Sequence, residues 1–314
     1  MKFSVVIPCR NAANYIQGAI ESVAIQTVQP IEVILVDDGC TDDSIAIAKR
    51  ILPGIKVLPS NYRNGAGTRN VGIEAAKGDW IAFLDADDVW YRDHLERARA
   101  LLADSKDVGF LNWYDSFSNE SPENKFSREN SLSIKQPTSG ISAEVFFSNY
   151  ESKHWFNMHG CVVLRQRLIT VGMLDTTQIR RHDIEMWFRV IHGQTWSFDP
   201  IPSTAYRQDT PGSISRNVAN TAYFAFLAIK KNLTALGPER GMRLLKDAAT
   251  SAMVRAYADG TDDDRKQIRK EVYEHLSLGN KIVFYFAKTS PFIFKKLVMG
   301  KRKLLSAISR GRKK

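Results

Sequence analysis

The sequence predicts an α/β protein in which a mainly parallel, Rossmann-like sheet is flanked by helices. Segments patterned as strands alternate with segments patterned as helices through the first 115 residues, as they do in βαβ units. Polar loops, two of them rich in Asp, follow three of these strands. Right-handed crossovers bring such loops to one edge of a parallel sheet, where ligands bind. The 314 residues are enough for one large domain of this class with an appendage.

The expected strands are short apolar runs that contain aromatic or β-branched residues. They cover residues 3–7, 32–36, 55–58, 80–84 and 108–113. The expected helices lie between them, at residues 15–26, 43–52, 67–77 and 91–103. The stretch at 115–140 is dominated by Ser, Asn, Glu and Lys, which predicts a long loop or an irregular insertion.

The second half of the chain reads as mostly helical. Helix and strand signals resume at 141–148 and 160–164, and an amphipathic helix begins near Asp183. Its apolar residues recur at i, i+3, i+4 and i+7, namely Ile184, Trp187, Phe188 and Ile191. Residues 220–278 have a helical pattern with breaks at Gly237-Pro238 and Gly260. We therefore expect a first domain over 1–218, a helical extension over 219–279 and a basic amphipathic tail over 280–314.

The net charge of +10 belongs to the tail. Residues 281–314 contain eleven Lys and Arg and no Asp or Glu, whereas the other 280 residues carry a net charge of −1. A protein that binds nucleic acid would carry its positive charge on the folded body, so no nucleic-acid partner is expected. A basic tail with apolar residues at roughly helical spacing predicts contact with an anionic membrane surface, and a solvated tail is the alternative.

Cysteine usage and hydropathy bear on the compartment. Cys9, Cys40 and Cys161 are few and scattered, which argues against a disulfide framework or a zinc site and fits a reducing cytosol. We see neither a signal peptide nor an apolar run of about 18 residues. The expected location is the cytoplasm, with peripheral attachment to the inner face of the membrane.

The most informative segment is 80–88, where an apolar strand runs into Asp85, Asp87 and Asp88. Carboxylates at the end of a parallel strand lie where open α/β sheets bind ligands. Hard oxygens at i and i+2 can share a divalent ion such as Mg2+ or Mn2+. Taken alone, this segment leaves a plain acidic turn as an equal alternative.

Four segments, in this order and spacing, closely resemble family 2 glycosyltransferases of the GT-A fold. They are V-V-I-P-C-R-N at 5–11, V-D-D-G-C-T-D at 36–42, T-R-N-V-G-I at 68–73 and F-L-D-A-D-D at 83–88. The resemblance runs from residue 3 to about residue 215. It implies an inverting transfer from a nucleotide sugar, UDP-linked, to a hydroxyl of a glycan or lipid-linked acceptor. Synthesis of a surface polysaccharide or lipopolysaccharide by a hexosyl- or N-acetylhexosaminyltransferase would follow.

The resemblance also implies a role for each motif. Asp38 would accept hydrogen bonds from the nucleotide base, and Arg69 would lie beside that base. Asp85 would contact the ribose or a metal-bound water, and Asp87 would ligate the cation, Mn2+ or Mg2+, that neutralises the leaving group. The implied nucleotide-sugar-binding residues are Pro8, Arg10, Asn11, Asp38, Arg69, Asn70, Asp85, Ala86, Asp87 and Arg207, with Asp85 and Asp87 as metal ligands.

The catalytic base is expected in the segment 180–189. Family members usually carry Glu-Asp at the start of this helix, and here Asp183 matches the Asp while His182 replaces the Glu. A carboxylate at a helix N-terminus is held ionised by the helix dipole, as a general base requires. Two alternatives remain: Asp183 only caps the helix, or His182 is the base. His159 and Trp155 are weaker candidates for the acceptor pocket.

Two other functions remain open from the sequence. The first is sugar-phosphate nucleotidyl transfer, because Gly65-Ala66-Gly67-Thr68-Arg69 looks like the Gly-rich loop of those enzymes. In them, however, the loop directly follows the first strand, and here that place is taken by residues 8–11, which contain no glycine. The second is a catalytically inactive nucleotide-sugar-binding or membrane scaffold protein, which the departure at His182 favours.

Overall fold

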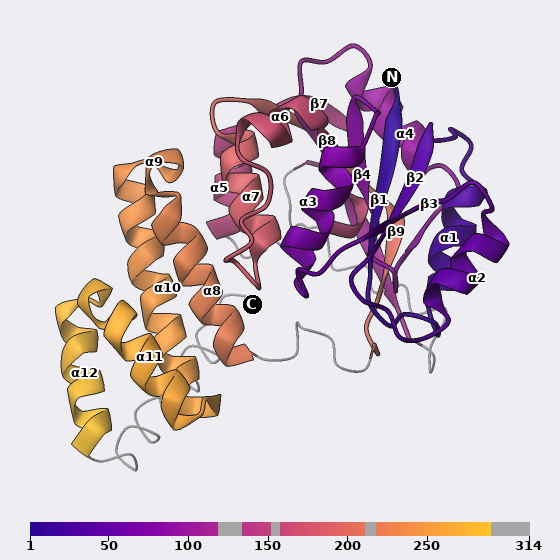
Figure 1. The fold of residues 1–314 in the computed structure, drawn as a ribbon. Helices are drawn as coiled ribbons and strands as arrows, with labels where there is room; N and C mark the ends of the chain where they lie inside the picture. The colour runs from indigo at the N-terminus through magenta and orange to yellow at the C-terminus, as the bar shows by residue number, and fades with distance from the viewer. Residues whose placement is uncertain (119–133, 152–157, 211–217, 290–314) are drawn as a thin grey trace. The chain divides into compact units, whose positions relative to one another are not determined.

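The computed structural model describes residues 1–118, 134–151, 158–210 and 218–289. The chain forms two compact units, residues 1–213 and 214–314 (Figure 1). The first contains a sheet with helices on both faces, and the described part of the second is helical. Among the described helices, none is both long enough and apolar enough to cross a bilayer.

The first unit is built on a sheet of nine described strands, ordered β3-β2-β1-β4-β8-β6-β9-β5, with β7 paired to β9. The strands are β1 (Phe3–Cys9), β2 (Glu32–Asp37), β3 (Lys56–Pro59), β4 (Trp80–Phe83), β5 (Val89–Trp90), β6 (Gly109–Phe117), β7 (Thr138–Ser142), β8 (Val162–Leu164) and β9 (Thr195–Arg207).

Strands β3, β2, β1 and β4 pair in parallel, which confirms the βαβ prediction for the N-terminal half. The other half is mixed, because β8 runs antiparallel to β4 and β6 while β9 runs parallel to β6. Strands β5 and β7 pair antiparallel with β9. Strand β6 also extends to Phe117 and β7 begins at Thr138, so both ends of the expected 115–140 loop are part of the sheet.

Helices cover both faces of this sheet (Figure 1). They are α1 (Ile16–Ala24), α2 (Ser44–Ile51), α3 (Gly65–Ala75), α4 (His94–Leu102), α5 (Ala143–Glu151), α6 (Arg165–Thr170) and α7 (His182–Ile191). Alternate side chains of a strand point to opposite faces. Val5 and Ile7 accordingly share one buried cluster with apolar residues of α1, α2 and α4, whereas Val6 faces α3.

Helix α3 approaches the sheet closely at Gly72. A Cβ at this position would press against Val6 and lie 3.3 Å from a methyl carbon of Val36. Glycine is therefore needed for the close approach, and it fixes α3 above β1 and β2. Asn64 caps the helix by accepting a hydrogen bond from the Gly67 N–H at 2.8 Å. This packing sets the position of Arg69.

Strand β9 was missed in the sequence because it contains Pro200 and Pro202, which disfavour a central strand. Both prolines fall in an irregularity of the β6–β9 pairing, between the pairs Asn112↔Asp199 and Tyr114↔Thr204. Proline is tolerated where the ladder is already interrupted. The strand then resumes its pairing and carries Arg207 toward the carboxylates that follow β4.

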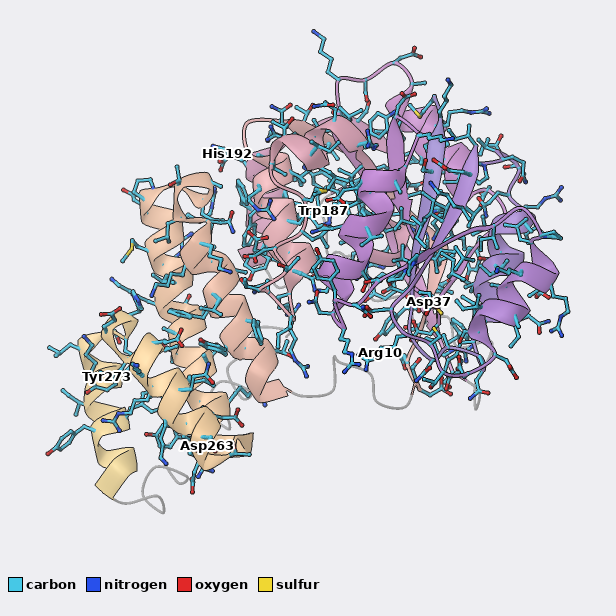
Figure 2. All side chains as sticks on the ribbon, viewed as in Figure 1. Arg10, Asp37, Trp187, His192, Asp263 and Tyr273 are labelled. Carbon is cyan, nitrogen blue, oxygen red and sulfur yellow. The ribbon has the colours of Figure 1, made fainter. Side chains whose placement is uncertain are left out.

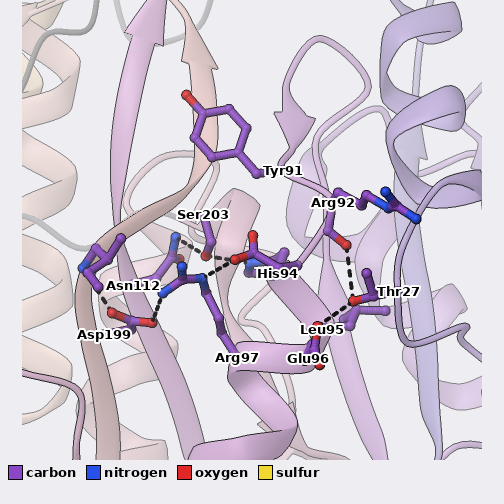
Figure 3. Close-up of polar contacts among 12 residues, drawn as sticks. Thr27, Tyr91, Arg92, His94, Leu95, Glu96, Arg97, Asn112, Asp199 and Ser203 are labelled. Atoms are coloured by element: carbon purple, nitrogen blue, oxygen red, sulfur yellow. Dashed lines mark hydrogen bonds and ion pairs between the residues drawn. The ribbon is translucent and has the colours of Figure 1, made fainter.

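A buried polar cluster holds this irregular part of β9 in place (Figure 3). Arg97 of α4 donates to Asp199 at 3.1 Å, and His94 Nδ1 lies 2.9 Å from the Ser203 hydroxyl. Asn112 of β6 donates to the same hydroxyl at 3.0 Å. Burial lowers the pKa of His94 to about 3, so its ring is neutral. The cluster ties α4, β6 and β9 together.

The second unit contains α8 (Val218–Lys231), α9 (Leu233–Leu236), α10 (Pro238–Asp259), α11 (Asp262–Val272) and α12 (Leu278–Thr289). The breaks expected at Gly237-Pro238 and Gly260 are confirmed. Phe284 of α12 packs against Tyr257 of α10, with ring centroids 5.8 Å apart. The boundary expected between 279 and 280 falls inside α12, and residues 290–314 of the expected tail lie outside the described residues.

Candidate functional site

The loops that follow β1, β2 and β4 meet at one edge of the sheet, as expected. Cys9 at the end of β1 pairs with Asp37 at the end of β2, and Val6 pairs with Phe83 of β4. Figure 2 shows Arg10 and Asp37 at the same end of the sheet. The polar segments 10–11, 38–42 and 85–88 are therefore brought together by strand register alone.

Asp38 lies just past β2 and is buried. Its Oδ1 accepts hydrogen bonds from the Ser60 hydroxyl and the Arg63 N–H, both at 3.0 Å. Among the described residues both bonds end on Oδ1, which leaves Oδ2 able to accept from a ligand. At the start of α2 the backbone is bound by Asp42 instead, because its Oδ1 accepts the Ser44 N–H at 3.1 Å. Asp38 is thus not needed as a helix cap.

Asn11 connects the first two loops. It has φ of 51°, a conformation that Asn tolerates better than most residues. Its side-chain oxygen accepts the Thr41 N–H at 2.8 Å. Pro8 lies within β1 beside Val36, and Arg10 is exposed.

Arg69 joins the third motif to the fourth and to α7. The guanidinium is buried and forms a short ion pair with Asp85. Its Nη1 also lies 3.1 Å from Nε2 of His182 and donates to the Gly65 carbonyl at 3.0 Å. Because arginine is always a donor, Nε2 of His182 accepts this bond and is the unprotonated ring nitrogen.

The three carboxylates after β4 have different electrostatic environments. Burial alone would raise the pKa of Asp85, but the charge and hydrogen bond of Arg69 outweigh it and hold that pKa below its usual value. Burial raises the pKa of Asp87, and the charge of Asp85 adds to this. Burial and the charges of Asp87 and Asp85 hold the pKa of Asp88 well above its usual value. Arg69 therefore compensates the charge of Asp85, whereas the influence of Arg207 on Asp87 and Asp88 is too small to offset burial and the neighbouring carboxylates.

Arg207 at the end of β9 lies beside this carboxylate group. Its backbone N–H donates to Asp88 at 2.8 Å, and its side chain donates to the Asp87 carbonyl at 3.3 Å. The guanidinium lies over the rings of Tyr15 and Phe117, 5.0 and 4.4 Å from their centroids. Stacking of this kind fixes the plane of an Arg side chain. The side chain of Arg207 is thus held beside Asp87, and its contact with the nucleotide sugar stays a prediction.

Asp88 and His159 form a buried pair on the other side of this group. Nδ1 of His159 lies 3.2 Å from Oδ2 of Asp88, and the ring stacks on Tyr206 with centroids 5.4 Å apart. Burial lowers the pKa of His159 to about 4. His159 therefore supports the loop after β4, while Trp155 lies outside the described residues.

Helix α7 places Asp183 in its first turn. Arg181, the residue just before α7 begins, has φ of 57°, and the chain turns sharply there into the helix. The negative charge of Asp183 acts to raise the pKa of both His182 and His159, so its charge is felt by the side chains of this site. Burial and the neighbouring Arg69 nevertheless lower the pKa of His182 to about 4. His182 is therefore neutral at pH 7 and a weak base.

The remainder of α7 is locked into the domain. Trp187, labelled in Figure 2, is fully buried and lies against Gly109 of β6. Glu185 accepts two hydrogen bonds from Arg189, at 2.8 and 2.5 Å, and Arg189 also donates to the carbonyls of Val171 and Met173. We call these two residues the Glu185–Arg189 clamp. It ties the turn that follows α6 to α7, the helix that carries Asp183.

Asn70 uses its amide to hold that same turn. Its Nδ2 donates to the Leu174 carbonyl at 2.8 Å, and its Oδ1 accepts the Leu174 N–H at 3.0 Å. The predicted contact between Asn70 and the nucleotide stays a prediction. Ala86 is buried within the loop between Asp85 and Asp87, where only its backbone could contact a ligand.

The donor set after β4 suits a divalent cation. Asp87 is a half-buried carboxylate whose pKa is raised by burial and by Asp85, and a cation would relieve this repulsion. Its Oδ2 accepts the Thr210 hydroxyl at 2.7 Å. Within the described residues, no three His, Cys, Asp or Glu side chains form a complete metal site. A cation here would need further oxygen ligands from a diphosphate or water.

Sequence reasoning missed several residues that shape the site. Ser60 and Thr210 are single hydroxyls in loops, and nothing in their local pattern reveals that they contact Asp38 and Asp87. Glu185 and Arg189 are spaced i, i+4 on a predicted helix, which could have revealed the clamp. The proximity of Cys9 and Cys40 could have been inferred from the predicted pairing of the first two strands.

Comparison with known proteins identifies related sequences. The model of the family described as Glycosyl transferase family 2 matches residues 4–170. An uncharacterized glycosyltransferase of Rickettsia typhi is 30% identical over 203 residues, 62% of this chain and 60% of that protein. The amylovoran biosynthesis glycosyltransferase AmsB of Erwinia amylovora is 38% identical over 108 residues, 32% of this chain and 36% of AmsB. The chain thus matches about 60% of the length of the rickettsial relative.

Solved structures share the fold. A structure of S. aureus TarS residues 1–349 in complex with UDP-GlcNAc has a TM-score of 0.69 at 14% identity, covering 92% of this chain and 88% of that one. The mannosyltransferase PcManGT from Pyrobaculum calidifontis, in complex with GDP-Man and Mn2+, has a TM-score of 0.53 at 18% identity, covering 90% and 82%. At this identity the likeness supports the GT-A fold alone. The match over 4–170, together with the strand-end motifs, shows that the chain belongs to glycosyltransferase family 2.

Proposed function

We propose that the protein is an inverting, metal-dependent glycosyltransferase that uses a UDP-sugar donor. The observation that carries the proposal is the arrangement at the sheet edge. There the buried acceptor Asp38, Asp85 in its ion pair with Arg69, and Asp87, whose pKa is raised by burial and by the charge of Asp85, follow strands β2 and β4. The UDP-GlcNAc in the TarS structure and the Mn2+ in PcManGT support the choice of donor and of cation.

The chain's residues divide the work of donor binding. Asp38 would accept from the nucleobase through Oδ2, and Asp85, oriented by Arg69, would accept from the ribose hydroxyls. Asp87 would hold a divalent cation, with Asp85 contributing through bound water, and Arg207 would contact the phosphates. Such a cation neutralises the charge that develops on the departing diphosphate. Pro8, Arg10 and Asn11 would border the nucleotide.

The transfer itself needs one base. Asp183 would take the proton from the acceptor hydroxyl as its oxygen attacks the anomeric carbon, while the bond from that carbon to the diphosphate oxygen breaks on the opposite face. The anomeric configuration is therefore inverted. His182 would act through Arg69 and not as a base, because its Nε2 is already an acceptor for the guanidinium. The presence of His182 where the family usually has Glu is thus compatible with an active enzyme.

We further propose a glycan or lipid-linked acceptor in surface polysaccharide synthesis, with the tail on an anionic membrane surface. Two observations support this. The similar protein AmsB is named for amylovoran biosynthesis, and residues 281–314 carry eleven positive charges without an acidic residue. A basic tail is attracted to anionic lipid, and it would bring the site close to a lipid-linked substrate.

The proposal is tested by thermal stability with UDP, in the presence of Mn2+ or of EDTA. We expect clear stabilisation only with Mn2+, since a ligand at 100 times its dissociation constant adds about 2.7 kcal/mol. Asp87→Asn should remove the Mn2+-dependent part, whereas Asp43→Asn, at an exposed residue before α2, should not. Equal stabilisation by UDP with EDTA and with Mn2+ would refute the metal assignment. No stabilisation by any nucleoside diphosphate would refute the donor site.

A further inference from the structure

Two cysteines lie together at the edge of the proposed donor site. Cys9 ends β1 and is buried, and Cys40 is half-buried in the loop after β2. Their sulfur atoms are 3.6 Å apart, although the residues are 31 positions apart in the chain. A disulfide has an S–S length of about 2.05 Å, so the sulfurs need to approach by only about 1.5 Å.

The surroundings of Cys40 favour its thiolate over that of Cys9. The Asn11 N–H points at Cys40 Sγ from 3.4 Å. The Cys40 thiol in turn lies 3.5 Å from the Cys9 carbonyl oxygen and 3.6 Å from the Cys9 sulfur. The hydrogen bond between the two thiols lowers the pKa of Cys40, and the Asn11 N–H adds to this, with burial and Asp37 acting against it. The pKa of Cys9 is raised, chiefly by its bond to Cys40 and by burial. One cysteine is thus an accessible nucleophile and the other a protonated neighbour.

We propose that Cys9 and Cys40 form a reversible dithiol–disulfide site that reacts with small hydroperoxides and controls donor binding. The control of donor binding rests on the proposed function, whereas formation of the disulfide does not. Cys161 is fully buried in the same unit and takes no part.

One hydroperoxide molecule is the oxidant that converts the two thiols into the disulfide. The Cys40 thiolate attacks the terminal oxygen of ROOH, the O–O bond breaks, and RO⁻ leaves and takes up a proton, so that Cys40 becomes a sulfenic acid. The Cys9 sulfur then attacks the Cys40 sulfur, and water leaves with the Cys9 proton. The two sulfurs lose two electrons in total and the peroxide gains them. A small dithiol reverses the reaction by thiol–disulfide exchange.

A disulfide here would alter the donor site through Asn11. The Cys40 sulfur would turn toward Cys9 and away from the Asn11 N–H, which now donates to it at 3.4 Å. Asn11 also holds Thr41 through its side-chain oxygen, and Asp38 lies two residues before Cys40 in the same loop. The oxidised loops would be joined covalently in a different geometry. We therefore expect weaker nucleotide binding in the oxidised state.

The test uses the full chain with Cys161→Ala, so that Cys9 and Cys40 are the only cysteines left. Hydrogen peroxide is added, free thiols are alkylated, and a peptide linking Cys9 to Cys40 is sought by mass spectrometry. UDP affinity is measured with Mn2+ before oxidation, after it, and after dithiothreitol. The matched control is Cys40→Ser in the same background. We expect the linked peptide, and UDP affinity lowered at least about threefold, the effect of losing one weak hydrogen bond, then restored by dithiothreitol.

The outcomes separate the two proposals. Failure of the linked peptide to form refutes the dithiol site, whether or not UDP binds. A linked peptide with unchanged UDP affinity refutes the control of donor binding, as does an equal loss of affinity in peroxide-treated Cys40→Ser. If the reduced protein fails to bind UDP, the proposed donor function is refuted while the linked peptide still reports on the thiols.

Discussion

Replacing Asp183 by Asn tests the proposed base most directly. The substitution keeps the size of the side chain and removes its charge and basicity. Loss of a general base lowers turnover by about a hundredfold to ten-thousandfold, which corresponds to about 2.7 to 5.5 kcal/mol in activation free energy. The structure argues against rescue by His182, whose pKa is about 4 and whose Nε2 accepts from Arg69. Removing the Asp183 charge would lower that pKa further. We therefore expect a loss of at least about a hundredfold.

The assay follows UDP release from UDP-GlcNAc with Mn2+, with water or an offered glycan as the acceptor. Thermal stabilisation by UDP and Mn2+ should be unchanged in Asp183→Asn, because no described hydrogen bond joins Asp183 to Asp38, Asp85 or Asp87. His182→Gln is the matched variant, since Gln can still accept a bond from Arg69, and it should retain most of the turnover. Turnover of Asp183→Asn within about threefold of the parent chain would show that it is not the general base.

Three further predictions concern packing, pH and the tail. Gly72→Ala should lower the free energy of unfolding by about 1–3 kcal/mol in urea titrations, because the added methyl group has to displace Val6 and Val36. His94 has an unfolded pKa near 6.5 and a folded pKa of about 3, because it is buried as a neutral ring. Above pH 6.5 this difference costs the folded state nothing. As pH falls from 6.5 toward 3, the unfolded state takes up the proton first, and the free energy of unfolding decreases by about 1.4 kcal/mol per pH unit. His94→Gln should therefore flatten the decline in urea stability between pH 6.5 and pH 5, and an unchanged slope would contradict the buried neutral ring. The full chain should sediment with anionic vesicles at low salt and less so at 1 M salt, where the Debye length is about 3 Å. A chain ending at Thr289, which keeps α12 and removes nine Lys and Arg, should stay in the supernatant, and equal sedimentation of both chains would refute the role of the tail.

The N-terminal half of the fold could be predicted because its signals are local. Each strand from β1 to β4 is a short, largely apolar run, and helices α1 and α2 between them are amphipathic. The strand-end motifs then followed from the rule that parallel strands share one ligand-binding edge. The mixed half was harder, because β7 and β9 exist through pairing with distant residues. Strand β9 contains two prolines that only the interrupted ladder accommodates.

In the candidate site, too, local patterns predicted some features and distant contacts determined the others. The positions of Asp38, Asp85 and Asp87 follow from their motifs and from strand register. Their charge states do not, since those depend on Arg69, on burial and on residues such as Thr210 that lie more than 100 positions away. The resemblance presented His182 as a departure from the family pattern. Its contact with Arg69 supplies a physical reason for a neutral acceptor at that position.

The Glu185–Arg189 clamp constrains how this protein can be altered in the laboratory. Glu185 depends on its partner, since removing Arg189 would leave a buried carboxylate without its cation. Single-site libraries aimed at a new acceptor would therefore lose folded variants at these two positions before any change of specificity could be detected. Randomising the first turn of α7 and the loops around Asp38 while leaving the clamp intact is the more productive search, because the helix that carries Asp183 then keeps its anchorage.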